Sequence, residues 1–392
     1  MSDIQFQVVI SIITCCVSSF VVLALTPLLT RFLQKHQLYK MPTADRWHTT
    51  PTVSFGGIAM FLGCAVGYIV APYSIGLLPV LGVCILFAGG FVDDIVCLSP
   101  RLKLLFQYSA AVVIVSGGLV FHLTHNVVLN QVITATWIVF VVNAVNFSDS
   151  MDGLSSGLSA ISTLFLGAIS ILVSSTGGAL AASLTLGASL GFLWYNKHPA
   201  RIFMGDCGAH LLGSLIAISA IFTANATEHL YFGASFASVC VGLPMIDTCY
   251  VIISRMLHKR NIFQGGKDHL PHVLVSYGYS EPLVIGMLYF AQVLFITVSL
   301  FLILFLTGLR GAPDPDRNGN SDESVRVTVG GVESPPLYAG RQGGFAGLDQ
   351  LNIELPVALA AQVTAVPSRF EVIVTVNGQA ANRTSVWLKN AP

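Results

Sequence analysis

The chain has 392 residues, of which 54% are hydrophobic and only 10% carry a charged side chain. Soluble globular proteins contain roughly 25% charged residues, so this composition excludes an ordinary soluble protein and favours a polytopic membrane protein. The 19 basic and 19 acidic side chains cancel, so no net charge favours nucleic acid, and the cysteines show no zinc or disulfide-scaffold spacing. The lipid bilayer is therefore the first partner that the sequence predicts, and no nucleic acid is expected.

Ten apolar segments meet or approach the length of about 20 residues that a membrane-spanning helix needs. They lie at about 4–29, 53–72, 76–92, 104–121, 131–146, 154–175, 178–195, 208–225, 231–254 and 283–308. We therefore predict an all-α polytopic membrane protein with about ten transmembrane helices, and we place its transmembrane domain at residues 1–308.

The basic residues of this domain are distributed unevenly between the two sides of the membrane. If every segment spans, the loops on one side carry twelve Lys and Arg residues and the opposite loops carry none. The twelve are Arg31, Lys35, Lys40, Arg46, Arg101, Lys103, Lys197, Arg201, Arg255, Lys259, Arg260 and Lys267. By the positive-inside rule, the basic side faces the cytoplasm.

The chain changes character after Gly308. Residues 309–323 form a polar linker rich in turn-forming residues, and short alternating or β-branched runs such as SVRVTV and FEVIVTV follow. We predict a small all-β, sandwich-like domain at 324–392, with a tight hairpin at Asn377-Gly378. GRQGGFAGLDQLNIELP and VTVNGQAANRTSVWL resemble a β-sandwich module at the C-terminal ends of exported bacterial proteins, which implies an extracytoplasmic position.

Most acidic residues of the membrane domain lie on its basic side. Asp93, Asp94, Asp149, Asp152 and Asp206 occupy loops or helix ends there. Carboxylates at membrane depth are costly, and several that converge without an equal number of bases favour a hard cation such as Mg²⁺. For any single Asp, a solvated loop face neutralised by Lys and Arg remains the alternative interpretation.

The segment FVDDIVCLSPRLKLLFQ places two adjacent carboxylates, Asp93 and Asp94, at a helix exit, with Lys103 and Gln107 at the start of the next helix. Adjacent like charges raise each other's proton affinity, so one carboxylate could act as a base near neutral pH while the other faces the metal. A charged cap pair is the alternative.

In NAVNFSDSMDGL, four polar residues recur every three positions: Asn143, Asn146, Asp149 and Asp152. On a helix or its frayed end, this spacing lines one face with amide and carboxylate oxygens. We therefore predict that this segment contributes to the same site.

Three further segments supply candidate ligands for phosphate. WYNKHPARIFMGDCGAHLLG carries Asn196 and then Asp206 between glycines, where backbone can approach a phosphate. In the first loop, Arg46 and His48 could bind substrate, although contact with anionic lipid is the alternative. His269 and His272 lack the partners of a zinc site, so we interpret them as donors to a diphosphate.

In chain order, the pieces DD, NxxNFxDxxDGL, WYNxxPAxxFMGDxG, the helix-borne Asp247 that follows Pro244, and DHLxH resemble the polyprenyl-phosphate N-acetylhexosamine-1-phosphate transferases over about residues 20–305. The first-loop DRWHTTPTVSFGG is more similar to the GlcNAc-1-phosphate branch than to the peptidoglycan branch. The resemblance implies ten or eleven helices in the bacterial inner (cytoplasmic) membrane and a cytoplasmic active site. It also implies transfer of a sugar-1-phosphate, first of all GlcNAc-1-phosphate, from a UDP-sugar to undecaprenyl phosphate with release of UMP. Mg²⁺ is the implied cofactor and Mn²⁺ the alternative metal.

The resemblance implies roles for individual residues. Asp93 resembles the base that deprotonates the lipid phosphate, and Asp206 the principal Mg²⁺ ligand. The catalytic prediction comprises Asp93, Asp94, Asp149, Asp152 and Asp206, of which Asp94, Asp149 and Asp206 are the predicted metal ligands. The predicted substrate-binding residues are Asn143, Asn146, Asn196, Lys103, Arg46, His48, His269 and His272. Two positions depart from the family pattern, because Pro271 stands where a histidine is usual and Ser150 where a glycine is usual.

Several alternatives stay open from the sequence. The substrate could be the muramoyl-pentapeptide nucleotide of peptidoglycan synthesis or another UDP-N-acetylhexosamine. Direct attack by the lipid phosphate is favoured over a covalent aspartyl-phosphate. A transporter would place acids near helix midpoints, and a scaffold role of the tail would leave the acidic loops unexplained. A homodimer is one option for the assembly.

Overall fold

The computed structural model divides the chain into two compact units, Met1–Ser299 and Leu300–Pro392. The described residues are 3–40, 52–227, 235, 238–261, 266, 268–306, 325–329, 331–333, 336–341, 349–353, 368–376 and 379–388. Each unit is considered by itself. The predicted boundaries at 308 and 323 lie outside the described residues, so the division into catalytic domain, linker and β domain stays a prediction.

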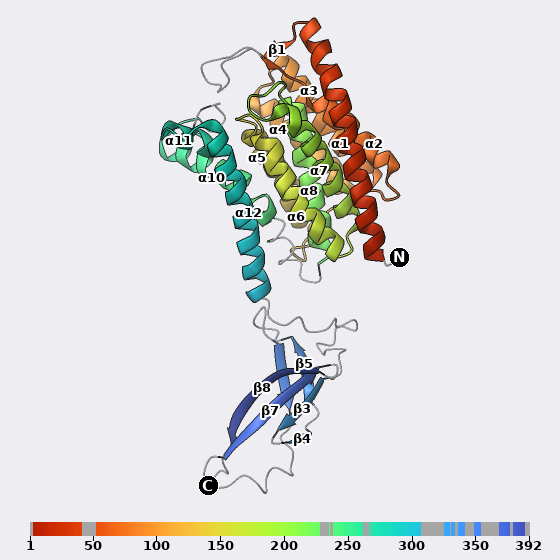
Figure 1. Ribbon diagram of the computed structural model, residues 1–392, viewed down its shortest axis with the longest axis vertical. Coiled ribbons are helices and arrows are strands. Elements are labelled where there is room, and N and C mark those ends of the chain that lie inside the picture. The colour runs from red at the N-terminus through yellow and green to blue at the C-terminus, as the bar shows by residue number, and fades with distance from the viewer. Residues whose placement is uncertain are drawn as a thin grey trace. The chain divides into compact units, whose positions relative to one another are not determined.

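The first unit is mostly helical (Figure 1). Its helices are α1 (Asp3–Lys35), α2 (Gly57–Val70), α3 (Leu77–Val96), α4 (Pro100–Ser116), α5 (Val127–Ser148), α6 (Leu154–Leu172), α7 (Thr176–Asn196), α8 (Gly205–Asn225), α10 (Gly242–Leu257), α11 (Leu270–Ser276) and the part of α12 (Glu281–Leu306) up to Ser299. A two-stranded pairing of β1 (Tyr39–Lys40) with β2 (Thr52–Val53) interrupts the all-α pattern in the first loop.

Each of the ten predicted apolar segments overlaps one of these helices. Within the described residues, seven helices are long and apolar enough to cross a membrane: α1, α3, α5, α6, α7, α8 and the Glu281–Leu300 part of α12. The other overlapping helices, α2, α4 and α10, have 14, 17 and 16 residues. The chain is thus a multi-pass membrane protein, and the count of ten spans stays a prediction.

Local sequence explains where several helices begin. Asn126 caps α5, because its side chain accepts a hydrogen bond from the Leu129 N–H at 3.0 Å. Pro100 opens α4 in the first turn, where a missing N–H has no cost. Gly153 precedes α6 with φ +76°, a conformation that glycine adopts without strain. These caps fix the ends of the helices that carry the polar segments.

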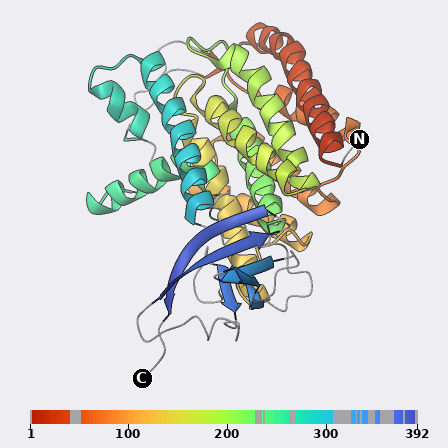
Figure 2. The same cartoon turned by 60° about the horizontal axis from the view of Figure 1, so that its bottom comes forward.

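Helix α8 is the centre of the first unit. In its most apolar window 94% of the residues are buried, against 17% in α1. It packs against α2, α3, α5, α6 and α7, whereas α1 packs along α7 and α2 (Figures 1 and 2). Because Asp206 lies in the first turn of α8, the central helix presents this carboxylate at one end of the helical unit.

The second unit contains antiparallel strands. They are β3 (Val325–Val329), β4 (Val332–Glu333), β5 (Pro336–Arg341), β6 (Asp349–Ile353), β7 (Ser368–Val376) and β8 (Gln379–Leu388). One sheet has the order β4-β3-β7-β8, and β5 pairs with β6. Asn377 and Gly378, the predicted hairpin turn, lie outside the described residues, but Val376 pairs with Gln379 on either side of them. The sandwich-like domain itself stays a prediction.

Candidate active site

Asp94, near the end of α3, caps the N-terminus of α8. Its Oδ1 accepts a hydrogen bond from the Asp206 N–H at 3.0 Å, and its Oδ2 accepts one from the Cys207 N–H at 3.0 Å. A carboxylate stabilises the unsatisfied N–H groups and the dipole at this end of a helix. Gly205 permits the approach, because it has φ +74° and a Cβ atom there would lie 2.5 Å from Asp94 Oδ2. The Asp94 carboxylate therefore fixes α8, and with it Asp206, against α3.

Lys103, from α4, joins the other two carboxylates. Its Nζ lies 3.0 Å from Asp93 Oδ2 and also contacts Asp206 Oδ2. Asp93 Oδ1 accepts a further hydrogen bond from the Leu98 N–H at 2.7 Å. Two carboxylates, from α3 and α8, thus share one ammonium group, and Asp94 lies beside them as the cap of α8. This excess of negative charge favours a cation.

The loop before α8 is held by the first loop of the chain. The Phe203 N–H donates to the Val53 carbonyl at 2.9 Å, and the N–H groups of Gly56 and Gly57 donate to the carbonyls of Phe203 and Met204 at 2.9 and 2.8 Å. A Cβ atom on Gly57 would lie 2.4 Å from the Gly208 nitrogen, so only glycine allows this approach. The end of the first loop therefore lies beside the start of α8, whereas Arg46 and His48 lie outside the described residues.

Asn143 lies in a buried polar network. Its Nδ2 donates to Gln107 Oε1 at 2.7 Å, and Gln107 Nε2 donates back to Asn143 Oδ1 at 3.3 Å. Gln107 Nε2 also lies 3.2 Å from His210 Nε2, and His210 Nδ1 lies 3.3 Å from the Leu86 carbonyl oxygen. Our sequence interpretation gave His210 no role, although its position four residues after Asp206 places both on one helix face.

The polar repeat after Asn143 continues as helix only to Ser148. The Asp149 N–H donates to the Asn146 carbonyl at 3.1 Å where α5 ends, so Asp149 is the C-terminal cap of α5. Both residues are partly buried. The helical face therefore includes Asn143 and Asn146, whereas Asp149 ends it and Asp152 falls in the turn beyond it.

Asp152 binds the segment between α7 and α8. Its Oδ2 accepts a hydrogen bond from the Ala200 N–H at 2.9 Å and lies 3.2 Å from His198 Nδ1. His198 Nδ1 in turn lies 3.4 Å from Glu281 Oε2 at the start of α12. These contacts give Asp152 a positioning role for the loop that leads to Asp206.

Asn196, at the end of α7, is only 1% exposed. Its Nδ2 donates to the Ile202 carbonyl at 3.0 Å, and its Oδ1 accepts hydrogen bonds from the Gly153 N–H and the Ser156 hydroxyl, each at 3.1 Å. Both ends of the amide are thus engaged within the protein. This geometry favours a role in holding two loops together over direct contact with substrate.

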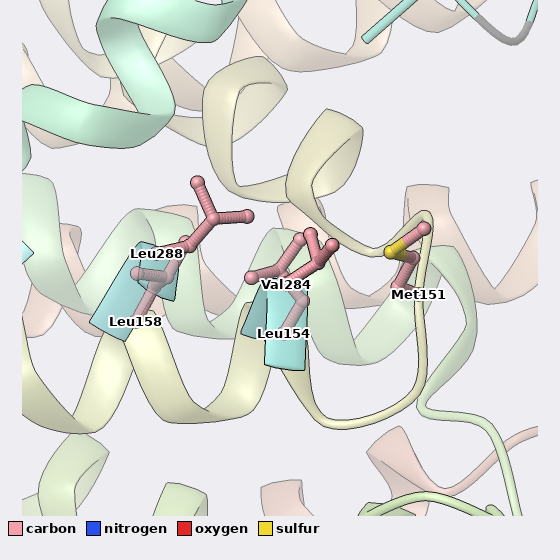
Figure 3. Close-up of a cluster of buried hydrophobic side chains, with 5 residues drawn as sticks. All are labelled: Met151, Leu154, Leu158, Val284 and Leu288. Atoms are coloured by element: carbon pink, nitrogen blue, oxygen red, sulfur yellow. The ribbon is translucent and has the colours of Figure 1, made fainter. Parts of the chain in front are cut away.

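The turn between α5 and α6 rests on α12. Met151, Leu154 and Leu158 pack with Val284 and Leu288 in a buried apolar cluster (Figure 3). The Tyr289 hydroxyl, on α12 beside the cluster, donates to the Gly153 carbonyl at 2.6 Å. This buried apolar cluster and the Tyr289 hydrogen bond fix the turn that follows Asp149.

The two predicted substrate-binding histidines lie next to α10, which supplies Asp247, a carboxylate of the family pattern to which the sequence analysis gave no role. His269 Nδ1 lies 2.7 Å from Asp247 Oδ2, and the Leu270 N–H donates to Asp247 Oδ1 at 2.6 Å. Asp247 and His269 are each 7% exposed and His272 is 6% exposed. An Asp partner fixes the orientation of an imidazole ring, so Asp247 sets the direction of His269 Nε2.

A second pair fixes the same segment. Arg255 of α10 donates from Nε and Nη2 to the two oxygens of Asp268, at 2.8 and 2.6 Å. These hydrogen bonds hold the pKa of Asp268 below its usual range. Bidentate pairs of this kind add geometric specificity, and this one holds the residue immediately before His269.

The histidine segment lies against the end of α5. The ring centroids of His269 and Phe147 are 5.5 Å apart, and those of His269 and His272 are 6.3 Å apart. Phe147 follows Asn146 directly. The histidines and the polar end of α5 are therefore neighbours, as expected for one substrate site.

Known proteins support the family that the motifs predict. The model of glycosyl transferase family 4 matches residues 77–224. The chain is 33% identical over 316 residues to the "Probable undecaprenyl-phosphate N-acetylglucosaminyl 1-phosphate transferase" of Bacillus subtilis, covering 74% of the chain and 87% of that protein.

Two further relatives represent two branches of the same chemistry. The chain is 33% identical over 282 residues to the "Decaprenyl-phosphate N-acetylglucosaminephosphotransferase" of Mycobacterium tuberculosis, covering 62% of the chain and 70% of the relative. It is 28% identical over 321 residues to the "Phospho-N-acetylmuramoyl-pentapeptide-transferase" of Caldicellulosiruptor bescii, covering 75% and 97%. The chain therefore belongs to glycosyl transferase family 4 and is a membrane-bound phosphotransferase, which confirms the family that its motifs predict.

Proposed function

We propose that this protein transfers GlcNAc-1-phosphate from UDP-GlcNAc to undecaprenyl phosphate. The products are UMP and a lipid-diphosphate sugar, which would start the synthesis of a cell-envelope polysaccharide. The observation that carries the proposal is that Asp93 and Asp206 share Lys103 at the ends of three helices, while Asp94 caps the helix that carries Asp206. The names of the relatives from Bacillus subtilis and Mycobacterium tuberculosis support the choice of sugar.

The reaction joins two phosphates. An oxygen of the lipid phosphate attacks the phosphorus that carries the sugar, the bond from that phosphorus to the bridging oxygen breaks, and UMP leaves with the electron pair. Asp93 would accept the proton of the lipid phosphate, and Lys103 would neutralise charge that develops on the transferred group. Asp94 acts through α8, because it fixes the first turn that presents Asp206.

The residues present fit a divalent metal. Mg²⁺ commonly takes one or two carboxylates and completes its shell with water and substrate phosphates. Within the described residues no group of three His, Cys, Asp or Glu side chains could hold a metal ion by itself. Asp206 would be the main ligand, Asp94 and Asp149 stay proposed ligands, and the bound Mg²⁺ or Mn²⁺ would neutralise the diphosphate.

The remaining residues divide into two proposed groups. Asn143, Asn146, His269 and His272 would bind the nucleotide sugar, since the histidine segment lies against the end of α5. Asp152 and Asn196 would position the loops around the site, because their polar atoms are engaged by backbone groups. Arg46 and His48 stay proposed substrate ligands from the sequence alone.

We also propose that the site faces the cytoplasm of a bacterial cell, where UDP-sugars are made. The twelve Lys and Arg residues on one side of the predicted topology support this orientation. The same topology would place an all-β domain at 324–392 outside the inner membrane, after a linker at 309–323.

The test is an assay with purified protein, undecaprenyl phosphate, Mg²⁺ and a panel of UDP-sugars. We expect a lipid-linked product and UMP with UDP-GlcNAc, and no turnover by Asp206→Asn. A product only with the muramoyl-pentapeptide nucleotide would replace the proposed substrate, and the absence of product with every nucleotide would refute the function.

A further inference from the structure

The acidic site has a second polar layer behind it. Its members are the Leu86 carbonyl of α3, Gln107 of α4, Asn143 of α5 and His210 of α8, which are linked by four contacts of 2.7 to 3.3 Å. Gln107 is 1% exposed and His210 is 2% exposed. We propose that Gln107 and His210 are positioning residues that set the register of the four helices carrying the reactive side chains, an inference that rests on the proposed function.

Each member of this layer lies one or two helical turns from a site residue on its own helix. The pairs are Leu86 and Asp93 on α3, Gln107 and Lys103 on α4, Asn143 and Asn146 on α5, and His210 and Asp206 on α8. A spacing of three, four or seven residues places both members of a pair on the same helix face. The layer therefore links the helices close to the level at which their site residues meet.

The contacts determine which atoms carry hydrogens. Gln107 Oε1 accepts from Asn143 Nδ2, so the Gln107 amide nitrogen faces His210 Nε2. An amide nitrogen donates, so His210 Nε2 must accept. The ring proton then resides on Nδ1 and donates to the Leu86 carbonyl. All four contacts are satisfied by one neutral tautomer of His210, the one with its proton on Nδ1. A network with a single arrangement of hydrogens is suited to fixing the register of the helices.

Helices α3 and α8 also approach each other closely between this layer and the acidic site. A Cβ atom on Gly90 would lie 2.7 Å from the Asp206 carbonyl oxygen, so α3 and α8 touch through backbone between Leu86 and Asp93. A shift of either helix would move Asp94 away from the N–H groups that it caps. Misplacement of reactive groups by about 1 Å can lower turnover by roughly a hundredfold, so the register matters for rate as well as for folding.

The experiment compares single and double replacements of the central pair. In Gln107→Leu and in His210→Leu, one partner is left without its hydrogen bond, and both the melting temperature and kcat should fall. In the double variant no unsatisfied partner remains between them, so the melting temperature should recover. We expect kcat to stay about tenfold or more below wild type in the double variant, with KM for UDP-GlcNAc within about threefold.

A conservative variant and a matched control complete the test. In His210→Gln, the new carbonyl oxygen can still accept from Gln107, so kcat should recover to within about threefold of wild type. Thr223→Val, at the other end of α8, removes a buried hydroxyl that lies 2.6 Å from Ser170 Oγ and should leave kcat unchanged.

The outcomes separate this inference from the proposed function. If wild-type protein forms no lipid-linked sugar, the proposed function fails. If wild type is active and kcat recovers together with the melting temperature in the double variant, Gln107 and His210 contribute only to packing, and the inference is overturned. The same conclusion follows if His210→Gln is as slow as His210→Leu.

Discussion

The carboxylate of Asp94 and the main chain of Asp206 are joined by a hydrogen bond of 3.0 Å across 112 positions of sequence. Asp94 therefore serves α8 as an N-terminal cap would, although it belongs to α3. The adjacent carboxylates consequently have different surroundings, since Asp93 faces Lys103 while Asp94 binds backbone N–H groups. We therefore expect Asp93 and Asp94 to have different roles.

Replacing Asp94 by Asn should lower both stability and turnover. The neutral amide can accept only through its single oxygen, so one N–H of the first turn of α8 loses its partner and the helix dipole loses its counter-charge. We expect a loss of about 1 kcal/mol in the free energy of unfolding and a fall of tenfold or more in kcat by rough estimate. Asp3→Asn, at the exposed start of α1, is the control, and wild-type kcat in Asp94→Asn would contradict this role.

Replacing Lys103 by Met should nearly abolish transfer. The variant keeps an apolar stem of similar length but leaves Asp93 and Asp206 adjacent without their shared ammonium group. We expect kcat to fall by roughly a hundredfold or more, as for loss of a group that stabilises transition-state charge. Steady-state kinetics with UDP-GlcNAc would measure the effect. Arg101→Gln, an exposed position of the same helix, should retain activity, and equal losses in both variants would show that Lys103 has no specific role.

The sequence predicted the meeting of Asp93 and Asp206 because both lie at helix ends on the basic side. It could not predict the cap that Asp94 forms, since capping rules describe residues next to the helix and this contact is long-range. His210 was missed because a single histidine inside an apolar helix looks like a packing residue. Its two partners, Gln107 and the Leu86 carbonyl, come from two other helices, α4 and α3, and only the folded arrangement brings them together.

Asn196 shows how hydrogen bonds within the protein refine a prediction made from a motif. Its place in a motif suggested a substrate contact, yet its amide bonds Ile202, Gly153 and Ser156 inside the protein. The motif predicted that Asn196 belongs to the site, and its burial and hydrogen bonds favour a positioning role there. The apolar segments predicted the helices well because a bilayer sets their length, whereas α2, α4 and α10, with 14, 17 and 16 residues, are shorter than the segments predicted for them.

Replacing Asn196 by Ala should loosen two loops at once. The change leaves the Gly153 N–H and the Ile202 carbonyl without their side-chain partner, and buried groups of this kind cost roughly 1–3 kcal/mol when unsatisfied. We expect a lower melting temperature and a higher KM for UDP-GlcNAc. Asn225→Ala is the control, because Asn225 Nδ2 likewise donates to a carbonyl, that of Val120 at 2.8 Å, but at the other end of α8. An unchanged KM would show that the loops do not shape the substrate site.

The pair of Arg255 and Asp268 should make stability depend on pH below about pH 4. Arg255 lowers the pKa of folded Asp268, so the pair contributes its full stability above the pKa of the unfolded carboxyl, about 3.9. This contribution is lost as the pH falls through the lower pKa of the folded state. Asp268→Asn should therefore melt below wild type at pH 7, and the difference should shrink in acid. Arg255→Gln should show the same trend, whereas a difference that is constant with pH would exclude the ion pair as its cause.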